Sequence, residues 1–139
     1  MDPLHLAHLV FLGLWGGILL CEFILECLGD DDHALRFTAR AHFWIDVLAE
    51  LPVLLGVLGT GAALLGRAWP PSAVLQLKVA AGLVAIGSNL YCAVLVALRY
   101  RRRGDPQALR AWRPRVRMTA LGVPFGAVAA WLGLRYFAG

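Results

Sequence analysis

The chain has 139 residues, of which 60% are hydrophobic and only 16% are charged. A soluble domain of this size usually carries about 25% charged residues, so the composition argues against an ordinary soluble domain. The net charge of +4 comes largely from arginines crowded into one segment, which is typical of a membrane protein's cytoplasmic loop. We therefore predict no nucleic-acid partner.

Four apolar blocks are long enough to cross the hydrocarbon layer of a bilayer, which takes about 20 residues of helix. They cover about residues 4–28, 41–65, 73–100 and 116–138. Little of the chain remains outside them. We predict an all-α fold, a transmembrane four-helix bundle that forms one domain over residues 1–139. The first block is not typical of a signal peptide, because it lacks a basic start and holds two glutamates.

The first two blocks are joined by an acidic segment. Gly29 is expected to stop the first helix, and Asp32 to cap a short surface helix that ends at Arg40. The second long helix then begins near Ala41. Pro52 lies inside it and should kink it, because proline lacks the backbone donor of a regular helical turn.

Proline and glycine mark the ends of the predicted helices in the second half of the chain. A tight turn is expected at residues 66–72, and a polar loop at residues 104–114. The last helix carries Gly122 and Gly126 at GxxxG spacing, which allows close approach of a neighbouring helix in lipid. The pattern leaves open a homo-oligomer.

Arginine is distributed unevenly between the two ends of the predicted bundle. Eight arginines lie between the third and fourth spans: Arg99, Arg101, Arg102, Arg103, Arg110, Arg113, Arg115 and Arg117. Arg36 and Arg40 lie at the same end, whereas only Arg67 and Arg135 lie at the other. Arginine-rich short loops face the cytoplasm, so we predict a bacterial inner-membrane protein with both termini outside. The bilayer itself, with its anionic headgroups, is the expected partner.

Ionisable residues recur inside the predicted spans, where they are costly and usually functional. The first helix carries Glu22 and Glu26, and the second carries His42, Asp46 and Glu50, all spaced four apart. Such spacing places each set along one helix face. Because the two helices are antiparallel, Glu26 is level with His42, and Glu22 is level with Asp46. Glu50 lies deeper, near the level of Asn89 on the third helix.

Four carboxylates converging in an apolar bundle must be neutralised by protons or by cations. We predict a transition-metal site of iron, copper, manganese or zinc, made by Glu22, Glu26, His42, Asp46 and Glu50. The three cysteines form no CxxC pair, so a cysteine-rich zinc site is not indicated. The expected role is redox chemistry or metal handling. A proton relay in a transporter or assembly subunit, or structural hydrogen bonding, remains open.

A second polar group is predicted at the opposite end. His5 and His8 lie at the start of the first helix, and Lys78 lies at the start of the third. These are either interfacial side chains or ligands of a metal or haem.

Short motifs resemble a group of small bacterial membrane proteins. They are Ala7-His8-Leu9 and Trp15-Gly16-Gly17 in the first helix, and Leu77-Lys78-Val79 in the third. The group includes the copper-resistance protein D domain and the HemJ-type protoporphyrinogen oxidase. This resemblance implies a haem b-dependent membrane oxidase in which His8 is the haem ligand, with Lys78 and Asn89 in the cofactor region.

This sequence departs from the HemJ pattern at Asn89, where that type carries histidine. We therefore expect haem to be bound weakly or not at all. A second stretch, Arg40-Ala41-His42 followed by Glu50-Leu51-Pro52, is similar to part of the membrane glutathione-transferase (MAPEG) family. The longer spacing from arginine to glutamate makes that family a minor alternative.

Overall fold

The computed structural model describes residues 2–137, and no strand occurs within that range. The chain order is α1 (Pro3–Glu26), α2 (Asp32–Ile45), the π-helical turn η1 (Asp46–Glu50), α3 (Leu51–Arg67), α4 (Ala73–Arg101), α5 (Pro106–Met118), the 3₁₀ turn η2 (Thr119–Gly122) and α6 (Val123–Phe137). The predicted all-helical fold is confirmed. Four continuous helical runs are long and apolar enough to cross a membrane, which fits an integral membrane protein.

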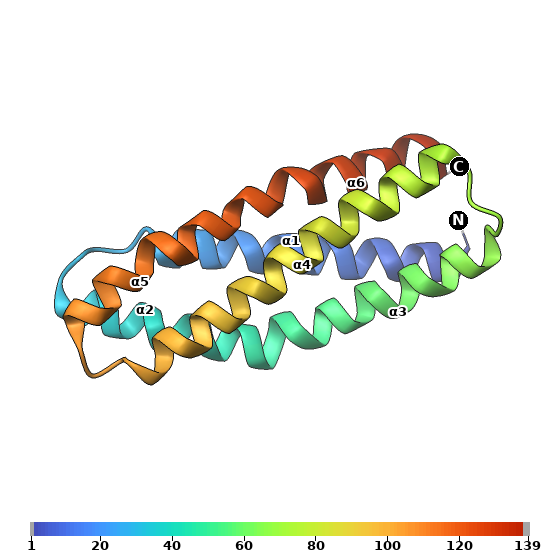
Figure 1. Ribbon diagram of the computed structural model, residues 1–139. Coiled ribbons are helices and arrows are strands. Elements are labelled where there is room, and N and C mark those ends of the chain that lie inside the picture. The colour runs from blue at the N-terminus through green and yellow to red at the C-terminus, as the bar shows by residue number, and fades with distance from the viewer. Residues whose placement is uncertain (1, 138–139) are drawn as a thin grey trace.

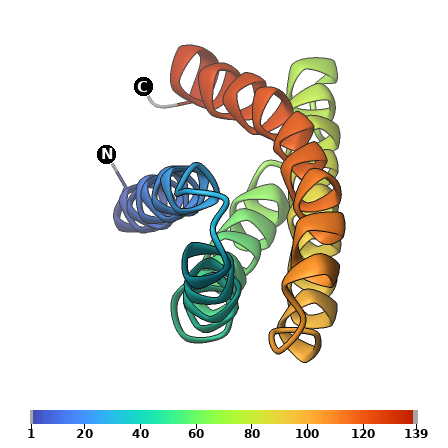
Figure 2. The same cartoon turned by 90° about the vertical axis from the view of Figure 1, so that its left-hand side faces the viewer.

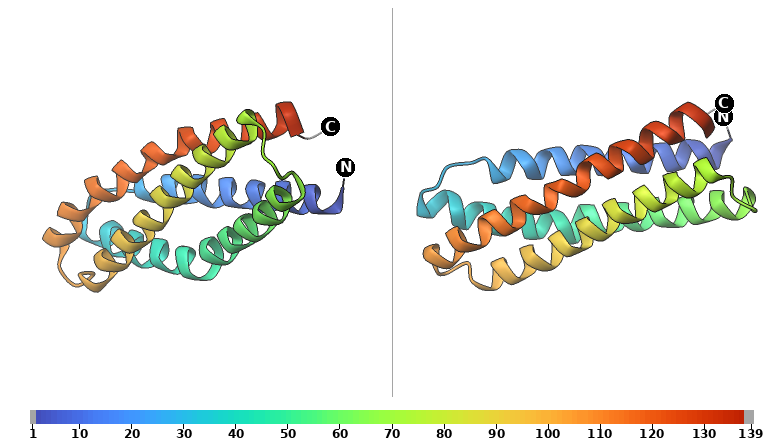
Figure 3. Two further views of the ribbon diagram at one scale, coloured as in Figure 1. Left: turned by 45° about the vertical axis from the view of Figure 1, so that its right-hand side comes forward. Right: turned by 45° about the horizontal axis from the view of Figure 1, so that its top comes forward.

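The bundle is elongated, with α2 and α5 at one end and both termini at the other (Figure 1). Seen along its length, α1 lies beside α2 and α3, whereas α5 and α6 follow α4 (Figure 2). Figure 3 shows α2 and α5 at the same end of the bundle, where the two helices are in contact. Both termini therefore lie at the same end of the bundle.

The outward surface is apolar and the interior is unusually polar. Leu48, Leu55 and Leu121 are each about 70% exposed, and many other large apolar residues along the spans are exposed too. By contrast, four carboxylates are less than a tenth exposed. Lipid, rather than water, is the solvent that suits such a surface.

The connection between the first two spans differs from the sequence prediction. Asp31, not Asp32, caps α2, because its Oδ1 accepts the backbone N–H groups of His33 and Ala34. The expected surface helix does not end at Arg40, and α2 runs on into η1 and α3 without a break. This run of 36 residues is about 54 Å long, whereas the hydrocarbon layer is about 30 Å thick. If Arg67 marks one edge of the layer, the other edge falls near Asp46.

Pro52 acts through the turn that precedes it. Because Pro52 has no N–H, it cannot donate the usual α-helical hydrogen bond to the preceding turn. The Leu51 N–H donates to the Asp46 carbonyl, five residues back, which is the hydrogen bond of a π-helix. The expected kink therefore takes the form of a π-helical turn. Such turns are frequent at functional sites, and this one begins and ends on the buried Asp46 and Glu50.

The expected loop at residues 104–114 is largely helix. Asp105 caps α5 through the N–H groups of Gln107 and Ala108, and Pro106 occupies the first turn. Asp-Pro was read as a turn, but aspartate at the cap followed by proline also begins helices. Leu109 of α5 packs against Leu35 and Ala39 of α2, so these two helices cover one end of the bundle.

Gly122 and Gly126 bring the fourth span close to α4. A methyl group at Gly122 would meet the Ser88 Cβ at 2.5 Å, and one at Gly126 would meet the Ala85 Cβ at 3.5 Å. The GxxxG pair therefore serves packing within one chain. It gives no support to contact between copies.

Candidate functional site

The predicted cluster of histidine and carboxylates exists, and four elements build it. α1 contributes Glu22 and Glu26, α2 contributes His42, and η1 contributes Asp46 and Glu50. α4 brings Asn89 and Arg99 against them. Each of these side chains is less than a tenth exposed, so the cluster is shielded from water and lipid.

The His42 ring is fixed by Glu26. Its Nδ1 lies 2.6 Å from Glu26 Oε1, a separation at which one of the two atoms must carry the proton. Since the carboxylate is an acceptor that is also bound by an arginine, we assign the proton to Nδ1. The lone pair of Nε2 then points away from Glu26. A carboxylate that orients a ligating histidine in this way is a common arrangement around protein-bound metals.

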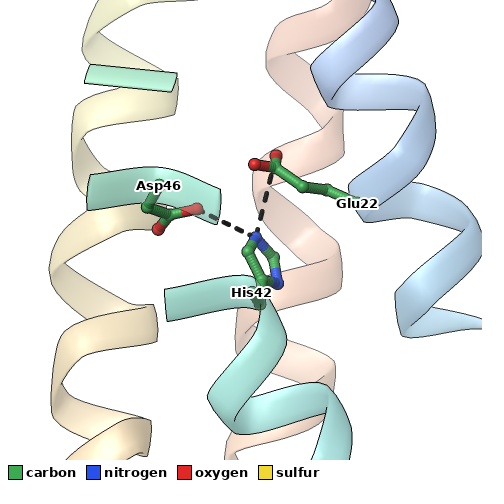
Figure 4. Close-up of side chains that lie close together, drawn as sticks. All are labelled: Glu22, His42 and Asp46. Carbon is green, nitrogen blue, oxygen red and sulfur yellow. Dashed lines mark ion pairs between the residues drawn. The ribbon is translucent and has the colours of Figure 1, made fainter. Parts of the chain in front are cut away.

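His42 Nε2 faces two further carboxylates. It lies 3.7 Å from Glu22 Oε2 and 3.5 Å from Asp46 Oδ1, as Figure 4 shows. These gaps are too long for hydrogen bonds. Atoms bound at about 2.05 Å to one tetrahedral ion lie about 3.4 Å apart, which is close to both distances. One ligand atom from each residue lies within 4.8 Å of the other two, so the three could share one ion.

Most of the facing atoms lack donors. His42 Nε2 and both Asp46 oxygens are buried without a hydrogen-bond partner among the described residues, and so is Glu22 Oε1, the neighbour of the oxygen that faces His42. Acceptor atoms that face one another in an apolar interior repel and are poorly solvated. A cation between them, either a metal ion or a proton, would remove that conflict.

Arg99 was assigned from sequence to the cytoplasmic loop, and this was wrong. It lies in the last turn of α4, 2% exposed, and donates to both oxygens of Glu26 at 2.6 and 3.0 Å. Glu26 is therefore engaged by Arg99 and His42 and is not among the three residues that could share an ion. A signal was present, since Asn89, Val96 and Arg99 follow helical spacing along one buried face.

Arg113 is a second buried arginine that sequence reasoning placed in a loop. It donates to the backbone carbonyls of Glu26, Leu28 and Gly29 and to the Asp30 carboxylate. The last carbonyls of a helix have no partner within the helix. Arg113 therefore closes the end of α1 and attaches α5 to the helix that carries Glu22.

Glu50 lies apart from the three facing residues. Its side chain is 2% exposed and sits beside Asn89 and Trp15, and Glu50 Oε1 has no partner among the described residues. Trp15 Nε1 donates to Asn89 Oδ1 at 3.3 Å. Asn89 is thus held by α1, next to the carboxylate with which it was predicted to be level.

The polar residues at the terminal end do not form a comparable cluster. His8 Nδ1 lies 2.8 Å from the Thr60 hydroxyl, which itself donates to the Gly56 carbonyl, so His8 ties α1 to α3. His5 pairs instead with Asp2 at 3.6 Å. Lys78 is half-buried against Gly133 of α6. His8 and Lys78 thus lie at contacts between helices at this end of the bundle.

The buried charges do not balance. Four carboxylates, those of Glu22, Glu26, Asp46 and Glu50, face two arginines, Arg99 and Arg113. Two negative charges remain, which one divalent cation would neutralise. Comparisons with protein-family models, curated proteins and solved structures found no match to this chain. The function must therefore be argued from the site itself.

Proposed function

We propose that the protein is an integral membrane protein that binds a divalent transition-metal ion through Glu22, His42 and Asp46. The observation that carries the proposal is that buried His42 Nε2 lies 3.5 Å from Asp46 Oδ1 and 3.7 Å from Glu22 Oε2, with no donor to His42 Nε2 or to either Asp46 oxygen among the described residues. Imidazole favours transition metals and carboxylates favour harder ions, so iron, manganese and zinc suit this set best. No cysteine belongs to the three, which disfavours copper(I).

The arrangement suits a metal ion that is exchanged or takes part in a reaction better than an ion with a purely structural role. Three protein ligands leave at least one coordination position open, as in catalytic zinc sites. Glu26 would orient His42 from behind, and Arg99 would hold Glu26 in place. The site would serve metal handling or redox chemistry close to one face of the bilayer. The arginine-rich end would be cytoplasmic and both termini outside.

The test is the metal content of purified protein. Wild-type protein, prepared without chelator and then offered iron(II), manganese or zinc, should hold about one ion per chain by mass spectrometry. Glu22→Gln and Asp46→Asn should each lose it while keeping wild-type helical content. Asp32→Asn is a matched control, because Asp32 is an exposed carboxylate paired with Arg110. Wild-type protein without metal after loading, or both site variants with full metal, would disprove the proposal.

A proton in place of the metal is the second candidate. It is favoured by Glu50, a deeper buried carboxyl with an unpartnered oxygen beside the same cluster. In that case the cluster would relay protons within a transporter or assembly subunit. Metal-free wild-type protein whose buried carboxyl infrared bands change on titration would support this function over metal binding. The resemblance to haem-dependent oxidases predicts instead a Soret band that disappears in His8→Ala.

A further inference from the structure

The end of the bundle opposite the termini carries an excess of unpaired arginine. Seven arginines are exposed there and form what we name the arginine collar: Arg36, Arg40, Arg101, Arg102, Arg103, Arg115 and Arg117. The other three arginines at this end have acidic partners, since Arg99 pairs with Glu26, Arg110 with Asp32 and Arg113 with Asp30. The collar is what remains after those ion pairs are removed.

Few acidic groups are left to balance the collar. Among the exposed acidic residues that the structure describes at this end, only Asp31 and Asp105 stand outside an ion pair, and both cap helices by accepting backbone N–H groups. The collar therefore carries a net charge of about five positive units against a low-dielectric bundle, which strengthens its attraction for anions.

The collar also lies at the level where a bilayer's headgroups would be. Arg115 and Arg117 immediately precede Met118 and Leu121, which are 66% and 70% exposed and belong in lipid. The Arg115 guanidinium lies 5.1 Å from the ring of Trp112, a residue type that favours the membrane interface. In the turn that follows α4, Arg103 lies over the ring of Tyr100 at 4.3 Å. Arginine and aromatic side chains thus form a belt beside lipid-facing apolar residues.

We propose that the arginine collar binds the headgroups of anionic phospholipids in the adjoining leaflet. Guanidinium groups form paired hydrogen bonds to phosphate oxygens, and the apolar residues just beyond them lie where the acyl chains would be. A nucleic acid offers the same phosphates but could not cover the apolar part of this surface. The proposal does not depend on metal binding, because no collar arginine contacts a side chain of the buried cluster; Arg117 donates only to the backbone carbonyl of Glu26.

The experiment compares lipid retention by the purified full chain. The protein is reconstituted in an equimolar mixture of phosphatidylglycerol and phosphatidylcholine, extracted mildly, and its bound lipids are counted by native mass spectrometry. The test variant is Arg36→Gln/Arg40→Gln/Arg115→Gln, whose side chains make no hydrogen bond within the described residues. The matched control is Arg67→Gln/Arg135→Gln, which removes exposed arginines from the opposite end.

Wild-type protein should retain phosphatidylglycerol in clear excess over phosphatidylcholine. One arginine near an anionic surface contributes about five-fold in affinity, so the triple variant should lose at least about ten-fold of this preference. The control should stay within about two-fold of wild type. Equal retention of the two lipids by wild-type protein, or an equal loss in test and control variants, would overturn the proposal. So would a duplex oligonucleotide that displaces the anionic lipid from wild-type protein.

Discussion

Replacing the buried Arg99 by methionine should destabilise the protein far more than the same replacement at the exposed Arg67. The side chain is 3% exposed and donates to both oxygens of Glu26. Methionine keeps much of the length of arginine but removes its charge and donors. Glu26 would then be a buried carboxylate left with His42 and with Arg113, whose Nε lies 4.0 Å from Glu26 Oε2.

The size of the effect follows from burial rather than from distance. Removing one partner of a buried ion pair costs about 3–5 kcal/mol, because the other charge stays behind without compensation. Arg67 and Asp2 form a pair of the same length, 2.6 Å, with side chains 63% and 40% exposed. An exposed pair is worth about 0–1 kcal/mol. Arg99→Met leaves a carboxylate in the interior and removes two hydrogen bonds to it, whereas Arg67→Met leaves an exposed carboxylate and removes one.

The assay is reversible unfolding in mixed detergent micelles, followed by circular dichroism. Arg99→Met should lose several times more free energy of unfolding than Arg67→Met. Adding Glu26→Gln to Arg99→Met should restore part of the lost free energy of unfolding, because the double variant leaves no unpaired carboxylate in the interior. Equal losses for the two single variants would refute the reasoning, and so would a double variant less stable than Arg99→Met alone.

Three further predictions concern packing, pH and topology. Gly122→Ala should lower the free energy of unfolding by about 1–3 kcal/mol, measured in the same micelles, because its methyl group would collide with Ser88. The hydrogen bond from the Ala34 N–H holds the pKa of the Asp31 carboxyl below its usual range. The cap at the start of α2 should therefore be fully formed at any pH above the ordinary aspartate pKa. That cap should weaken as pH falls through the lower folded-state value, seen as faster amide exchange at Ala34. A cysteine introduced by Gln107→Cys should react with an impermeant reagent applied from the cytoplasmic side.

Each of these has a matched control. Gly126→Ala should cost much less than Gly122→Ala, because its methyl group meets Ala85 at an ordinary contact distance. Asp31→Asn should retain a cap that no longer responds to pH, since asparagine also caps helices. Labelling at position 107 is done in a background without Cys21 and Cys27, which are exposed. Reaction only from the outside would invert the proposed topology.

The sequence by itself determined the helical class, the number of spans and the convergence of His42 with Glu22 and Asp46. These depend on quantities that are local to the chain. The length of an apolar block decides whether a helix can cross a bilayer, and spacing of four residues decides which side chains share a helix face. Counting from the connection between two antiparallel helices was then enough to place Glu26 beside His42, as observed at 2.6 Å.

Only the tertiary structure decided which charges meet. Glu26 was expected among the metal ligands, but Arg99 reaches it from a helix 73 positions later in the chain. Nothing local reveals that contact, because it depends on the rotation and depth of α4 relative to α1. The same holds for Arg113, which entered the bundle only because α5 folded as a helix and packed on α2. Burial and long-range ion pairing thus determine which arginines neutralise the cluster and which belong to the arginine collar.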